Sequence, residues 1–115
     1  MKTNMNKVEL IGFAGMNPEI RELAGNVKIA RFPLATKENY RDKNGDWISN
    51  TTWHHVVLWN DNASVAYDAI KKGDRVHITG KVSYRTYEAS NGEKRFSAEI
   101  VAYECKVISK IVAVE

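Results

Sequence analysis

The stretch from Thr51 to Trp59, TTWHHVVLW, decides the fold class of this chain. β-Branched and aromatic residues fill it, which is the composition of a β-strand. Alternate residues of a strand point to opposite faces. One face then carries Trp53, His55, Val57 and Trp59, and the other carries His54, Val56 and Leu58. We expect the second set to face the core, which leaves two indole rings on an outer face.

Further strand signals lie on both sides of this stretch. Residues 7–13, 27–36, 75–87 and 95–109 have strand composition. The first of these segments has apolar residues on both of its faces, so we expect both faces to be covered. In the second, the apolar alternation slips between Ile29 and Phe32, which predicts a β-bulge near Arg31. In the fourth strand, we expect Val76, Ile78, Val82 and Tyr84 to face the core and Ser83, Arg85 and Tyr87 to face outward.

One segment, about residues 62–72, is predicted to be a helix. Its apolar residues recur at helical spacing, Asn60 or Asp61 can begin it, and Gly73 can end it. The order is therefore three strands, one helix and two strands, in a chain of 115 residues that can bury one core. Five strands in so short a chain are expected to curl into a small, partly open Greek-key barrel. A flat sheet with one covering helix is the alternative, and strand periodicity does not separate the two.

Composition excludes several classes of protein. Hydrophobic residues make up 43% and charged residues 27%, which is typical of a globular domain. No run approaches the roughly 18 apolar residues of a membrane span. Cys105 is the single cysteine, so an internal disulfide is excluded, and we expect it to pack as a small core residue.

Nothing in the sequence has the pattern of an active site. There is no glycine-rich phosphate loop, and no serine can be paired with a base. His54 and His55 are neighbours on a strand, so they point to opposite faces and are poorly placed to hold one metal ion. We therefore expect no enzyme activity, no cofactor and no metal.

The functional signal lies in aromatic residues that alternate with cations. The aromatic residues are Tyr40, Trp53, Trp59, Tyr84 and Tyr87, among Lys37, Arg41, Lys43, Lys81, Arg85, Lys94 and Arg95. Exposed rings stack on unpaired bases and cations meet phosphates, but Trp and Tyr also mark protein interfaces. The interleaved cations favour a nucleic acid, and the net charge of +3 permits an anionic partner without demanding one. Residues 38–50 are polar, with Asn44-Gly45 as a turn signal, and form either a mobile loop that closes on a ligand or a hairpin tip.

Four blocks of the sequence resemble the bacterial-type single-stranded DNA-binding protein (SSB) family. They are NKVELIG at residues 6–12 with Gly15 and NPE at 17–19; FPLAT at 32–36 leading to YRDK at 40–43; TWHHVVLW at 52–59; and KKGDRVHITGK at 71–81. The blocks keep the family's order and spacing over about residues 5–109, and together they are far more specific than any one of them.

This resemblance implies an oligonucleotide-binding (OB) fold over residues 5–110. It implies sequence-independent binding and protection of single-stranded DNA in replication, recombination and repair, by a cytoplasmic, nucleoid-associated homotetramer built as a dimer of dimers. The family's base-stacking residues match Tyr40, Trp53, Trp59 and Tyr87, where Trp is common at 40 and 87 and Phe at 59. His54 matches a position that supports subunit assembly. The seven cations named above are the expected phosphate contacts.

The two ends of the chain depart from the family pattern. Family members usually continue into a linker and an acidic tip that recruits repair and replication proteins, whereas residues 110–115 read KIVAVE. The chain is thus either shortened or naturally tail-less, and recruitment through such a tip is not expected. Residues 1–4 precede the usual start and are expected to be disordered. Two rivals stay open: an RNA-binding barrel, and a protein-interaction barrel in a replication or DNA-transfer complex.

Overall fold

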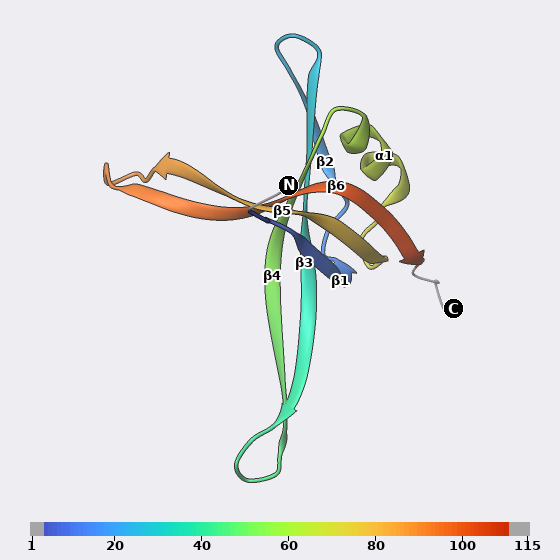
Figure 1. Cartoon of the computed structure of the whole chain (residues 1–115), viewed down its shortest axis with the longest axis vertical. Helices are drawn as coiled ribbons and strands as arrows, with labels where there is room; N and C mark the ends of the chain where they lie inside the picture. Colours follow the sequence, from blue (N-terminus) through green and yellow to red (C-terminus); the bar gives the residue numbers. More distant parts are fainter. Residues whose placement is uncertain (1–3, 111–115) are drawn as a thin grey trace.

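The computed structural model describes residues 4–110, which form six strands and one helix (Figure 1). The elements are β1 (Val8–Ala14), β2 (Glu19–Leu23), β3 (Val27–Arg41), β4 (Trp47–Trp59), α1 (Asp61–Ala69), β5 (Arg75–Glu88) and β6 (Lys94–Ser109). The expected disorder of residues 1–3 and the expected short end at 111–115 lie outside the described residues. Asn4 is described and lies exposed before β1.

Five of the strands close into a barrel, as the sequence predicts for an OB fold. The sheet order is β1-β5-β6-β4-β3, and β3 pairs back to β1 at Ala35–Phe13 and Leu34–Ala14. β4 and β6 pair in parallel, while the other pairs are antiparallel. The closing pairs exclude the flat-sheet alternative.

Closure of the barrel brings the backbones of β1 and β3 unusually close together at Gly12. A Cβ at this position would overlap the carbonyl oxygen of Ala35 on β3. Only glycine therefore allows β1 to approach β3 at this distance.

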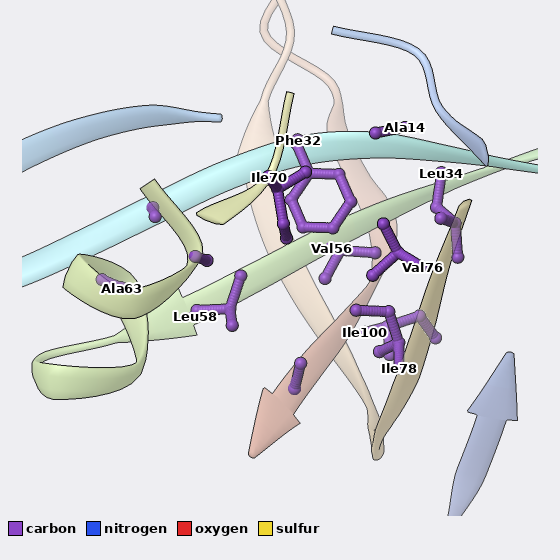
Figure 2. Close-up of a cluster of buried hydrophobic side chains, with 13 residues drawn as sticks. Ala14, Phe32, Leu34, Val56, Leu58, Ala63, Ile70, Val76, Ile78 and Ile100 are labelled. Carbon is purple, nitrogen blue, oxygen red and sulfur yellow. The ribbon is translucent and has the colours of Figure 1, made fainter. Parts of the chain in front are cut away.

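The core fills the barrel and is covered at one end by α1. It includes Phe32 and Leu34 from β3, Val56 and Leu58 from β4, and Ile78 from β5, all at most a few per cent exposed (Figure 2). Ala63, Ala66 and Ile70 bring the helix segment onto this cluster. Cys105 is partly buried and packs against the same cluster, and burial raises the pKa of its thiol to about 11. Cys105 was predicted as a small core residue, and it lies instead at the edge of the core, partly exposed.

Two long hairpins extend from the barrel in different directions (Figure 1). One is β3–β4, whose pairing runs without interruption from Ile29–Trp59 to Arg41–Trp47. The other is β5–β6, which is paired from Arg75–Ser109 to Glu88–Lys94. Of the two alternatives for residues 38–50, the hairpin tip is correct. The Asp42 carboxylate accepts hydrogen bonds from the N–H groups of Asn44 and Asp46, both at 2.9 Å, and so orders the turn.

The helix is shorter than predicted and ends at Ala69 rather than near Lys72. Two side chains capture the next backbone donors. The Asp74 carboxylate accepts from the N–H of Lys71 at 2.9 Å, and the Asn17 amide oxygen accepts from the N–H of Lys72 at 2.7 Å. These bonds replace the helical pattern, so the two lysines lie in a turn.

Two strand predictions were wrong in their detail. β2 was missed because it is short and mostly exposed, so its sequence lacks the apolar alternation of a strand. Hydrogen bonding to β3 holds it in the sheet. The bulge near Arg31 is absent, since β3 keeps one register with β4. Register shifts occur instead in the β5–β6 pair, opposite Arg75–Val76 and opposite Thr79–Gly80, and β6 carries one extra residue at each of them.

Two burial predictions also need correction. Tyr84 is 72% exposed rather than buried, because β5 has already left the barrel at that point and its inward parity no longer faces a core. Ile11 and Phe13 are exposed on β1, so this face is not covered by the described part of the chain.

Residues 4–110 contain no helix with the length and hydropathy needed to cross a membrane. Nor do they contain a cluster of side chains suited to holding a metal ion.

Candidate nucleic-acid interface

The outer face of the β3–β4 hairpin carries the two tryptophans that the sequence singled out. The register places Trp53 opposite Ala35 and Trp59 opposite Ile29. Residues directly opposite in an antiparallel pair share a face. Val56 and Leu58 have the other parity on β4 and belong to the core, so both tryptophan rings lie on the side away from the core. Trp53 is 57% exposed and Trp59 is 40% exposed. The predicted outward orientation of both rings is therefore confirmed.

Trp53 lies in a shallow groove beside two lysines. Its ring packs over Gly15, where an added Cβ would come within 2.5 Å of the ring atom Cζ3. Gly15 thus makes room for the indole. Lys37 and Lys72 line the same groove. Lys37 was predicted as a phosphate contact, whereas Lys72 was predicted only as part of the helix.

A cleft of about 350 Å³ lies between the β3–β4 and β5–β6 hairpins. Arg31 and Arg85 line it, and the Glu99 carboxylate joins them. Arg31 Nη1 lies 3.2 Å from Glu99 Oε2, and Arg85 Nε lies 3.3 Å from Glu99 Oε1. The Glu99 side chain is only 10% exposed, whereas both arginines remain substantially exposed. A buried anion therefore positions two cations at the surface of the cleft.

The same two arginines also border the groove that contains Trp59. Its lining includes Arg21 and Ile29 as well. Since Arg31 and Arg85 line both hollows, the cleft and the Trp59 groove are adjacent. Arg85 was predicted as a phosphate contact. Arg31 was missed, because a bulge was expected near it and the face to which its side chain points could not be assigned.

The β5–β6 hairpin adds an aromatic ring and further cations. Tyr87 lies opposite Arg95, and Arg85 lies opposite Ser97, so these side chains share a face as predicted. Lys81 has the same parity, opposite Val101. Lys94 does not, because it lies opposite Glu88 on the other face. Arg95 is partly engaged by Glu93, with Nη2 3.8 Å from Oε2.

The remaining predicted residues lie near the tip of the β3–β4 hairpin. Tyr40 lies opposite Ile48 and has the parity of the core side, so it occupies the face opposite to Trp53. Arg41 has the parity of Trp53, and Lys43 lies in the exposed turn. The structure therefore does not bring Tyr40 onto one face with the two tryptophans.

The aromatic residues singled out from the sequence did not include five that are exposed in the structure: Phe13, Trp47, Tyr67, Phe96 and Tyr103. Trp47 had a signal that could have found it. It precedes Trp53 by six residues, as Trp53 precedes Trp59, and an even spacing along a strand keeps side chains on one face. The polar residues around it led to its assignment to a loop.

His54 lies on the inner parity, where it was predicted. Its Nε2 is 2.9 Å from Thr36 Oγ1, and burial lowers the pKa of the imidazole below its usual value. Its role in subunit assembly stays a prediction.

Comparison with known proteins identifies the family. Residues 5–108 match the model of the single-strand binding protein family. The chain belongs to this family. It is 34% identical over 105 residues to the single-stranded DNA-binding protein of Neisseria meningitidis, covering 91% of this chain and 60% of that protein. It is 35% identical over 109 residues to single-stranded DNA-binding protein 1 of Chlorobaculum tepidum, covering 94% of this chain and 67% of that protein.

Solved structures of family members have the same fold. The SSB of Plasmodium falciparum, in a complex with single-stranded DNA, superposes with a TM-score of 0.82 at 31% identity, over 96% of this chain and 99% of that chain. A deletion mutant of the Thermus aquaticus protein gives a TM-score of 0.80 at 27% identity, over 91% of this chain and 51% of that chain. The chain thus spans about three fifths of the Neisseria relative and half of the Thermus chain.

Proposed function

We propose that this chain binds single-stranded DNA without sequence preference and protects it during replication, recombination and repair. One observation carries the proposal. Trp53 and Trp59 lie exposed on one face, with the cations Arg31 and Arg85 in the cleft and groove beside them. Base stacking and phosphate neutralisation are the two main contributions to the free energy of single-strand binding. Relatives named for this activity, and one solved with single-stranded DNA, support it.

The arrangement favours unpaired bases over a duplex. A ring can stack on a base only if that base is free of its neighbours, and in a duplex every base face is already covered. Stacking also tolerates any base, since each base has a π face, and contributes about 1–3 kcal/mol per ring. Such a surface binds and shields a strand, and we propose binding without catalysis.

We further propose that the chain assembles as a dimer of dimers in the cytoplasm, on nucleoid DNA. Support for self-association comes from β1. Residues 8–12 of this strand pair with β5 on one edge, and within residues 4–110 no strand pairs with their other edge. Ile11 and Phe13 are also exposed on β1. An open edge with apolar side chains favours pairing with a second copy.

Fluorescence anisotropy of labelled oligonucleotides tests the binding proposal. We expect tight binding of oligo-dT at low salt, weak binding of a duplex of equal length, and weaker competition by oligo-rU than by oligo-dT. Preferential binding of oligo-rU would favour the RNA-binding rival. The absence of any oligo-dT binding at low salt would overturn the proposal and favour a protein partner for the same aromatic residues.

A further inference from the structure

The tip of the β3–β4 hairpin carries an aromatic residue, Trp47, that the predicted interface does not include, beside Arg41, which was predicted as a phosphate contact. Trp47 lies directly opposite Arg41 at the last pair of the ladder. The Arg41 guanidinium carbon lies 4.9 Å from the centroid of the indole ring, which is within the range of a cation–π contact. The guanidinium thus orients the ring, while the indole remains 67% exposed.

Folding does not explain this exposed indole. Trp47 is not part of the buried core cluster, and its neighbours around the hollow at the tip are Asn39, Ile48 and Ser49. An exposed indole held beside a cation is, however, suited to stacking on an unpaired base.

The position of Trp47 continues the proposed path of the DNA strand. Trp47, Trp53 and Trp59 are spaced by six residues and share one face, so neighbouring rings are separated by about 20 Å of strand. On the same face of β3, one cation lies opposite Trp47, and one more lies opposite each of the two stretches of β4 between neighbouring tryptophans. Arg41 is opposite Trp47, Lys37 is opposite Thr51, and Arg31 is opposite Val57.

We propose that Trp47 and Arg41 form an additional binding site for single-stranded DNA at the far end of the β3–β4 hairpin. The indole stacks on an unpaired base, and the Arg41 guanidinium meets the adjoining phosphate. The proposal rests on the proposed function and extends it, because it lengthens the strand that one subunit contacts. DNA is favoured over a protein partner here because the cations run along the whole face beside the rings.

Length-dependent binding provides the first test. We expect Trp47→Ala to weaken binding of a long oligo-dT roughly tenfold. An oligo-dT too short to reach from Trp59 to the hairpin tip should bind the variant and the wild type equally. Trp47→Phe should restore most of the loss, because a ring is retained. Tyr67→Ala is the matched control, since it removes an exposed ring with a cation–π contact, that of Lys71, from α1, away from the hollow at the tip.

Fluorescence provides a second test that does not depend on affinity. In the double variant Trp53→Phe and Trp59→Phe, Trp47 is the only tryptophan left. Saturation with long oligo-dT should quench its emission strongly. Unchanged emission at saturation, together with unchanged affinity of Trp47→Ala for every length, would overturn this inference and leave the proposed function standing. Failure of the wild type to bind any oligo-dT would instead overturn the proposed function.

Discussion

Glu99 limits the charge that the cleft offers to a phosphate. Its buried carboxylate contacts both Arg31 and Arg85, so an approaching phosphate competes with an anion that is already in place. Glu99→Gln removes that charge and leaves a side chain of similar size. We expect the variant to bind oligo-dT more tightly at low salt. The slope of log affinity against log salt should become steeper by about 0.7 for each extra phosphate neutralised.

Glu104→Gln is the matched control for this prediction, because it removes the same charge from the same strand. Glu104 pairs with Lys106 at 3.1 Å and does not line the cleft. Equal gains in affinity for the two variants would show that only the net charge affects binding and that the position of Glu99 in the cleft has no effect.

His54 makes stability depend on pH. Burial lowers its pKa in the folded chain below the usual 6.5, so the unfolded chain binds the proton more readily. Stability therefore falls as the pH drops through about 6.5, and this loss is absent at higher pH. Urea unfolding at pH 5.5 and 7.5 measures it. His54→Gln should show a smaller difference between the two pH values, and a difference equal to that of the wild type would contradict the assignment.

At the scale of the elements, the close approach of β1 and β3 depends on a missing side chain. Gly12→Ala would place a Cβ against the Ala35 carbonyl, which is backbone and cannot swing away. We expect a loss of roughly 1–3 kcal/mol in the free energy of unfolding, measured by denaturant titration. At Gly15 the neighbouring atoms belong to the Trp53 ring, which can move. Gly15→Ala should therefore weaken DNA binding more than stability, and the opposite order would contradict this account.

The elements also show how far the sequence could predict the structure. The period of two in β4 was sufficient to place Trp53 and Trp59 outside, because Val56 and Leu58 defined the inner face. The same parity argument failed for Tyr84, since it assumes that a core lies beneath every inward position, and a hairpin that extends beyond its barrel has none. Trp47 and β2 were missed because pairing partners, and not local composition, hold both in strands.

For the whole molecule, the open edge of β1 predicts self-association. Native mass spectrometry should give four times the mass of the chain. Ile11→Lys places a charge on the exposed apolar face of β1 and should give smaller species, with little effect on the fold because Ile11 is already exposed in the single chain. A wild-type protein that remains monomeric at micromolar concentration would contradict the proposed assembly.

The central claim concerns the location of the DNA on the molecule. Photo-crosslinking with a 5-iododeoxyuridine oligonucleotide, followed by mass spectrometry of the linked peptides, tests it most directly, because this base crosslinks to aromatic rings on which it stacks. We predict adducts at Trp53 and Trp59, on the outer face of β4. Adducts confined to Tyr67 of α1 or Tyr103 of β6, with none on β4, would contradict the account.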